Sequence, residues 1–230
     1  MSLSLDADNY LQTSQNGGVN KQPLLIKFLA RVVSIVFHPL FINGYVAYYL
    51  VFMQPGFFDG MNERAKSFVV IQVIINMIFF PAVAVFLLKA TGFIDSIFLK
   101  TQKERIIPYI TSSIFFFWMY LVFRNQSYIP IRLTAFVFSV FISASAALIA
   151  NIYFKISMHG IGVGGLLGFF LLIIFKDSSF GITLPFMMVI FICGSVLTSR
   201  LLVSDHSIKD VYYGFFLGLI VQLLCSTFIR

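Results

Sequence analysis

Charged residues are scarce in this chain of 230 residues. They make up 11% of the sequence, and hydrophobic residues make up 59%, whereas soluble domains contain about 25% charged residues. Apolar runs of roughly 20 residues, the length that crosses a hydrocarbon core as a helix, recur along the chain. Short alternating segments typical of a transmembrane barrel are missing. The sequence therefore predicts an all-α, polytopic transmembrane helical bundle.

Cysteines and carboxylates are also few. The two cysteines, Cys193 and Cys225, lie in apolar runs without ligand spacing, so we expect neither a disulfide nor a zinc site. Lys and Arg outnumber Asp and Glu by 16 to 9, a formal net charge of +7. In a membrane protein such residues set topology and contact headgroups. The charge therefore favours a lipid bilayer, and no nucleic acid, as partner.

The first residues are polar and lack the basic and apolar regions of a signal peptide. We expect a flexible polar tail over residues 1–24. The remainder shows no repeat, linker or low-complexity block, so residues 25–230 are expected to form a single transmembrane domain.

About seven helices are expected, six in a core and one before it. Their predicted ranges are 30–53, 68–90, 107–123, 132–153, 160–175, 181–203 and 208–229. Because successive crossings alternate in direction, the loops after the second, fourth and sixth helices open on one side. Those loops carry polar clusters at residues 100–108, 155–160 and 198–214. Three clusters far apart in sequence are thus expected to converge.

The third cluster contains residues suited to phosphoryl transfer. His206 and Asp210 stand four residues apart, so they share one face of a helix that begins near Ser204. A carboxylate in that place fixes the tautomer of the imidazole and leaves its other nitrogen free as nucleophile or base. Arg200 offers a planar fork for phosphate oxygens.

These residues have the pattern S-R-x5-H-x3-D, which resembles the third signature of the type 2 phosphatidic acid phosphatase (PAP2) superfamily. "ISMH", residues 156–159, is similar to the second signature, P-S-G-H, and keeps its serine and histidine. The first signature, K-x6-R-P, is matched by Lys100 and Pro108, with Ile107 in place of arginine and Arg105 two residues earlier. Lys103 is the alternative to Arg105. The resemblance covers roughly residues 68–229.

The resemblance implies a membrane-embedded, metal-independent lipid phosphatase without a cofactor. His206 would form a phosphohistidine, Asp210 would orient it, and His159 would protonate the leaving group and then activate water. Five side chains would hold the substrate phosphate: Arg200, Lys100, Arg105, Ser157 and Ser199. The few carboxylates on this side support the absence of a two-metal site independently.

The substrate would be a membrane lipid phosphate or pyrophosphate. The alternatives are a lipid phosphotransferase of the same fold and a non-catalytic phospholipid-binding membrane protein. Outside the candidate site, basic residues number five on the cluster side and six on the other. This balance leans toward an extracytoplasmic site in the cell membrane. The sequence does not define the oligomeric state.

Two further features concern packing. His38, within the first apolar run, has no evident partner, so we expect a packed or interfacial histidine. Gly160, Gly164 and Gly168 recur every four residues and predict a face on which the fifth helix approaches a neighbour closely. The free N–H groups at the start of that helix would also point toward the phosphate.

Overall fold

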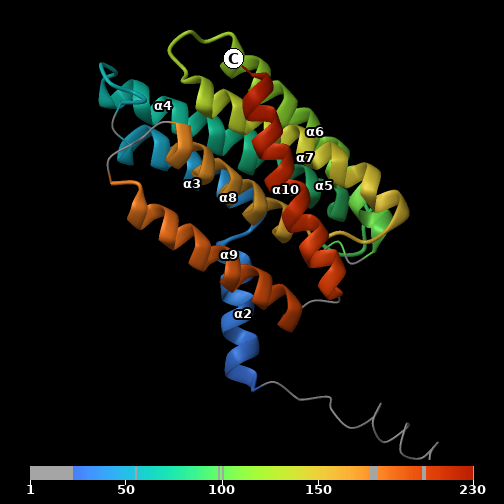
Figure 1. Cartoon of the computed structure of the whole chain (residues 1–230). Helices are drawn as coiled ribbons and strands as arrows, with labels where there is room; N and C mark the ends of the chain where they lie inside the picture. The colour runs from blue at the N-terminus through green and yellow to red at the C-terminus, as the bar shows by residue number, and fades with distance from the viewer. Residues whose placement is uncertain are drawn as a thin grey trace, which may run out of the picture.

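The computed structural model describes residues 23–54, 56–97, 99, 101–176, 181–203 and 206–229. All regular secondary structure in these residues is helical, and the helices pack into one bundle (Figure 1). Within these ranges, six helices are long and apolar enough to cross a membrane, or seven if the bent first pair counts as one span. The predicted all-α polytopic bundle is confirmed. The expected tail lies outside the described residues except for positions 23 and 24.

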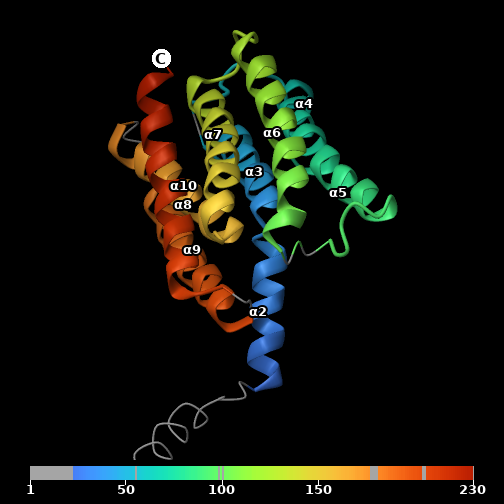
Figure 2. The same ribbon diagram turned by 90° about the vertical axis from the view of Figure 1, so that its right-hand side faces the viewer.

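Six spans run alternately up and down the bundle (Figure 2). The first consists of α4 (Glu63–Val73), the π-helical segment η2 (Ile74–Phe79) and α5 (Phe80–Ala90). The others are α6 (Gln102–Arg124), α7 (Ile131–Tyr153), α8 (Met158–Lys176), α9 (Thr183–Val203) and α10 (Ile208–Phe228). We call the end where α5, α7 and α9 finish and α6, α8 and α10 begin the site end, and the opposite end the far end.

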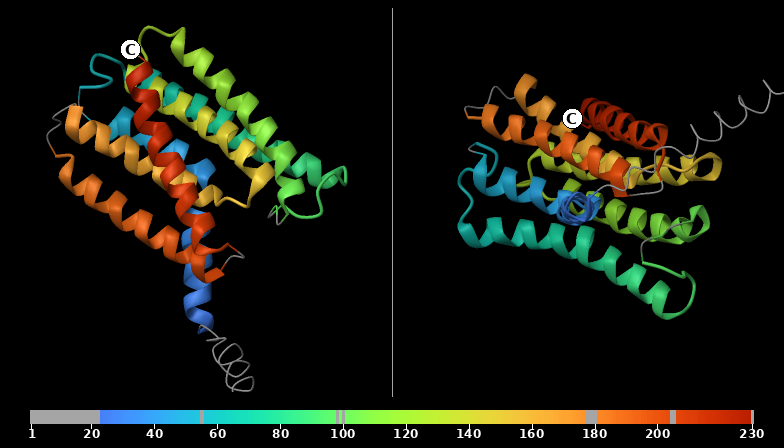
Figure 3. Two further views of the ribbon diagram at one scale, coloured as in Figure 1. Left: turned by 45° about the vertical axis from the view of Figure 1, so that its right-hand side comes forward. Right: turned by 90° about the horizontal axis from the view of Figure 1, so that it is seen from below.

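The first predicted helix, residues 30–53, is broken in the structure. α2 (Leu24–Val36) is bent by 57° from α3 (Pro39–Tyr48), which continues into the π-helical segment η1 (Tyr49–Met53). The break follows from Pro39, which has no N–H to donate and whose ring clashes with the carbonyl four residues earlier. α2 packs against α9 and projects from the site end; seen from below, it is nearly end-on (Figure 3).

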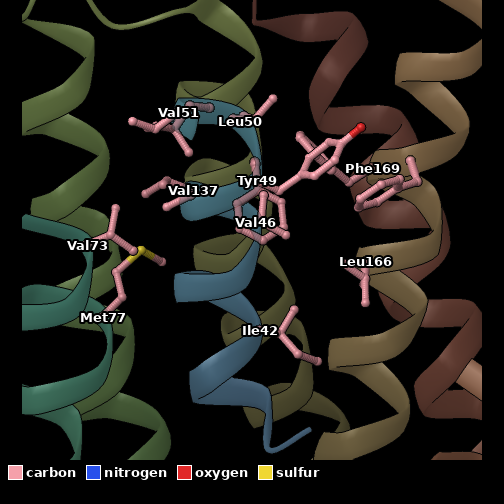
Figure 4. Packing of buried hydrophobic residues seen from close by; sticks show 14 of the residues in the cluster. Ile42, Val46, Tyr49, Leu50, Val51, Val73, Met77, Val137, Leu166 and Phe169 are labelled. Atoms are coloured by element: carbon pink, nitrogen blue, oxygen red, sulfur yellow. The ribbon is translucent and has the colours of Figure 1, made fainter. Parts of the chain in front are cut away.

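α3 lies in the middle of the core and contacts α4, η2 and α8. Buried aliphatic side chains on its length meet others from η2 on one side and from α8 on the other (Figure 4). The side chains labelled there include Ile42, Val46, Leu50, Val73, Met77, Leu166 and Phe169. The helix outside the resemblance is therefore integral to the bundle.

The predicted glycine face of α8 packs on α10, with which α8 makes its most extensive contact. A Cβ built at Gly160 would lie 2.6 Å from the carbonyl oxygen of Val211, and one at Gly214 would lie 2.5 Å from that of Ser157. Only glycine allows two helix backbones to approach this closely. Because α8 and α10 run in the same direction, this contact brings their N-termini together at the site end.

Candidate functional site

Three loops and the α2–α3 break meet at the site end. Arg105 Nη1 donates to the carbonyl oxygen of Ile156 over 3.2 Å, which joins the start of α6 to the loop before α8. The backbone N–H of Ser157 donates to the carbonyl oxygen of Asp210 over 3.1 Å, which joins that loop to the start of α10. The three polar clusters that are far apart in sequence are therefore in contact.

His206 lies one residue before the N-cap of α10 and beside Asp210. Ser207 and Asp210 form a capping box in which the Ser207 N–H donates to Asp210 Oδ2 over 2.9 Å and the Asp210 N–H donates to Ser207 Oγ over 3.2 Å. The same Oδ2 lies 3.6 Å from His206 Nδ1. That separation is an ion-pair contact rather than a hydrogen bond. The cap holds the carboxylate next to one ring nitrogen, so Nε2 is the nitrogen left for chemistry.

The His206 imidazole is held neutral by its surroundings. Its side chain is 5% exposed. Burial, and then the positive charges of Arg105, Arg200 and Lys155, lower its pKa to about 4, against the opposing effect of Asp210. The unprotonated ring, which is the nucleophilic form, therefore prevails at neutral pH.

Arg105 is a buried bridge at the base of this cluster. Its side chain is 6% exposed, and its Nε donates to the carbonyl oxygen of Leu99 over 2.8 Å in addition to the bond to Ile156. Lys103, the alternative phosphate ligand, is exposed at the start of α6. The structure thus brings Arg105, and not Lys103, into the cluster. Lys100 lies outside the described residues.

The two serines are buried, and their hydroxyls bond to helix backbone. Ser157 is fully buried, and its Oγ accepts a hydrogen bond from the N–H of Gly160 over 3.3 Å. Ser199 Oγ donates to the carbonyl oxygen of Ser195 over 2.7 Å. The Ser157 hydroxyl therefore stabilises the start of α8, and the Ser199 hydroxyl bonds within the last turns of α9. Their contact with a phosphate stays a prediction.

His159, in the first turn of α8, faces the α2–α3 break. Its Nε2 lies 2.9 Å from the carbonyl oxygen of Ser34, and its ring meets that of His38 nearly at right angles, with ring centres 5.2 Å apart. Arg200, in the last turn of α9, lies close enough to His38, His159 and His206 for its charge to interact with all three. The structure therefore brings His159, Arg200 and His206 together.

His38 is the residue of this cluster that sequence reasoning missed. It caps α3, where its Nδ1 accepts a hydrogen bond from the N–H of Leu40 over 3.3 Å. The available signal was the His-Pro pair inside an apolar run, because a proline there breaks the helix and exposes polar backbone. No pattern in the sequence pairs His38 with His159, 121 positions later.

Within the ranges that the structure describes, no three His, Cys, Asp or Glu side chains are grouped as a metal site. The expected absence of a metal and of a cofactor stays a prediction.

Comparisons of the chain with protein-family models, curated proteins and solved structures found no match. The resemblance to PAP2 phosphatases therefore rests on the quoted residues. What the fold and the site define is a class: an all-helical, multi-pass membrane protein with three histidines and several cationic side chains gathered at one end of the bundle.

Proposed function

We propose that the protein is a membrane-embedded phosphatase that hydrolyses a lipid phosphate or pyrophosphate through a phosphohistidine on His206. The observation that carries this proposal is the His206–Asp210 pair at one end of a membrane bundle, in which the imidazole is buried close to the charges of Arg105 and Arg200 and the carboxylate is half-buried. A neutral imidazole next to a fixed carboxylate is a nucleophile, and cations around it suit a phosphoryl group.

In the first step, Nε2 of His206 attacks phosphorus, and the bond from phosphorus to the leaving oxygen breaks. His159, which begins the step protonated on both ring nitrogens, gives one proton to that oxygen and becomes neutral. The oxygen leaves on the lipid alcohol or the lipid monophosphate. Asp210 stabilises the positive ring that results, and Arg200 and Arg105 stabilise the charge on the non-bridging oxygens. No metal ion is needed to balance this step.

In the second step, water attacks the phosphohistidine and gives a proton to His159, which regains its starting form. The bond between phosphorus and Nε2 breaks, and inorganic phosphate leaves. His206 returns to its neutral form, which its lowered pKa favours at neutral pH.

A substrate already held in the bilayer suits a site at helix ends. Its phosphate reaches the site at headgroup level while its chains stay among the exposed apolar side chains of the spans. Outside the candidate site, the sequence predicts six basic residues on the far side and five on the site side, a balance that favours a site on the extracytoplasmic face of the cell membrane.

The second candidate is a non-catalytic phospholipid-binding protein. One observation bears on it: two donors of Arg105 and the hydroxyls of Ser157 and Ser199, which a phosphatase would aim at the transition state, already bond within the protein, whereas the positive charges that attract a phosphate headgroup remain. A phosphotransferase would use the same phosphohistidine and pass the phosphate to an acceptor other than water.

The test is phosphate release from a panel of lipid phosphates and pyrophosphates by the purified full chain in detergent, measured with and without EDTA. Variants His206→Ala and Asp210→Asn are compared with Asp59→Asn, which changes an exposed aspartate in a turn at the far end. We expect His206→Ala to abolish turnover and Asp210→Asn to lower it by at least about 100-fold, since a misoriented imidazole loses rate. Asp59→Asn should match the wild type.

Normal turnover by His206→Ala would refute the nucleophile assignment. Lipid binding without any turnover would establish the second candidate, and phosphate appearing on an added alcohol would establish a phosphotransferase. Activity lost with EDTA would indicate metal chemistry instead.

A further inference from the structure

The break in the first span leaves one backbone carbonyl without its usual helical donor. Pro39 cannot donate to the carbonyl oxygen of Ile35, and the N–H of His38 bonds to that oxygen instead, over 3.2 Å. In a continuous helix the N–H of His38 would bond to the carbonyl oxygen of Ser34, four residues earlier. The Ser34 carbonyl is thus released from the helix.

The released carbonyl is the group that lies 2.9 Å from His159 Nε2. A carbonyl oxygen only accepts hydrogen bonds, so the ring nitrogen must be the donor. The neutral His159 ring therefore carries its proton on Nε2, and its Nδ1 is unprotonated. Ser34 is buried, so water does not compete freely for this carbonyl.

The side chain of His38 completes the arrangement. It caps α3 through Nδ1, so its neutral ring also carries the proton on Nε2. Its fixed ring packs against that of His159, with an interplanar angle of 88°. α2 and α3 thus hold His159 by one hydrogen bond and by one ring contact.

We propose that the His38–Pro39 break is a positioning device for His159: it presents the Ser34 carbonyl, fixes the proton on Nε2, and leaves Nδ1 as the nitrogen that exchanges protons. This inference rests on the proposed function, in which His159 serves as acid and then base. Within that reaction, the doubly protonated His159 ring gives its Nδ1 proton to the leaving oxygen, and the neutral ring, which keeps Nε2–H, then takes a proton from water at Nδ1. Pro39 and His38 act through His159 and are positioning residues.

The decisive variant is Pro39→Ala. In this variant, the residue at position 39 has an N–H that can donate to the carbonyl oxygen of Ile35. The N–H of His38 is then free to donate to the Ser34 carbonyl, in competition with His159. The substitution places a good helix former in a helix, so it does not weaken the helix itself. Pro81→Ala, at a buried proline in the first turn of α5, is the matched control.

The first measurement is the tautomer of His159 by ¹⁵N NMR of the full chain with labelled histidine, in detergent. The chain has only three histidines, so substitution of each assigns the signals. We expect Nε2–H in the wild type and in Pro81→Ala, and a mixture of tautomers in Pro39→Ala. An Nδ1–H tautomer in the wild type, or an unchanged tautomer in Pro39→Ala, overturns the proposal.

The second measurement is phosphate release. Pro39→Ala should lower kcat by about tenfold or more and leave KM within about twofold, since the cations that hold phosphate are untouched. His38→Asn keeps a capping side chain but removes the ring, and should lower kcat without changing the unfolding temperature. Wild-type kcat in both variants overturns the proposal. If the wild type turns over no lipid phosphate, the proposed function fails, and the tautomer measurement alone decides this inference.

Discussion

The contact between α8 and α10 can be tested by adding a single methyl group. At Gly164, a Cβ would overlap the carbonyl oxygen of Phe215 and would lie 2.9 Å from its carbonyl carbon and 3.0 Å from the nitrogen of Leu219. Carbon atoms in contact are about 3.5–4.0 Å apart. The carbon contact alone therefore demands a shift of about 0.6 Å, and clearing the oxygen demands more, so we expect Gly164→Ala to separate the helices by about 1 Å.

The neighbouring glycine provides the control. At Gly165 the nearest atom to an added Cβ is 3.9 Å away, which is an ordinary contact. Both substitutions gain up to about 1 kcal/mol of helix propensity, but only Gly164→Ala incurs an overpacking cost of about 1–3 kcal/mol. The two variants should therefore differ by about 1–3 kcal/mol in free energy of unfolding. For a chain of this size, that is roughly 2–12 °C in unfolding temperature.

The same shift should affect turnover, because α8 carries His159 and α10 follows His206. A misplacement of about 1 Å can lower a rate by about 100-fold. Unfolding temperature in detergent and phosphate release are measured for both variants. Equal unfolding temperatures for Gly164→Ala and Gly165→Ala would refute the close packing of α8 on α10. If Gly164→Ala is destabilised but keeps wild-type turnover, the packing of α8 on α10 does not determine the geometry of the site.

Two further predictions concern charge at the site end. The pKa of His206, followed by NMR titration, should be about 4 rather than 6.5. Because the folded pKa is the lower one, the unfolded state binds more protons between these values, so stability should fall as pH drops from about 6.5 to 4; a titration near pH 6.5 contradicts this. Arg105→Lys keeps the charge but cannot reproduce the two bonds to backbone carbonyls, and should cost about 1.5–3 kcal/mol in thermal unfolding. Arg124→Lys, at an exposed far-end arginine, should change the free energy of unfolding little. Equal unfolding temperatures for the two variants would contradict the bridging role of Arg105.

Helix positions could be predicted well because length and hydropathy determine them. α7 was expected at 132–153 and is found at Ile131–Tyr153. The start of α6 was placed five residues late, at 107, because the Thr101–Glu104 capping box precedes the apolar run. That box is visible in the sequence as T-x-x-E and could have corrected the boundary.

The meeting of the three polar segments at one end was predictable, but the contacts within them and the presence of His38 were not. Arg105, Ser157 and Asp210 were expected at one end because the side on which a loop lies depends only on the number of spans that precede it. The partners to which side chains donate hydrogen bonds depend on tertiary packing, and a local sequence pattern does not determine them. Ser157, expected to bind phosphate, is buried and caps the start of α8, and His38 gained its partner through a helix break.

The spacing from His206 to Asp210 has two physical explanations that the sequence alone does not separate. Ser207 and Asp210 form a capping box, and a helix start of this kind occurs in proteins with no catalytic role. A cap, however, does not require a histidine immediately before it, and still less one that is 5% exposed beside arginines. Burying a titratable ring next to cations is unfavourable for its protonated form, and a purely structural position would be served as well by an apolar residue. The surroundings of His206, rather than the spacing, are therefore what favour a phosphoryl-transfer site over a helix cap alone.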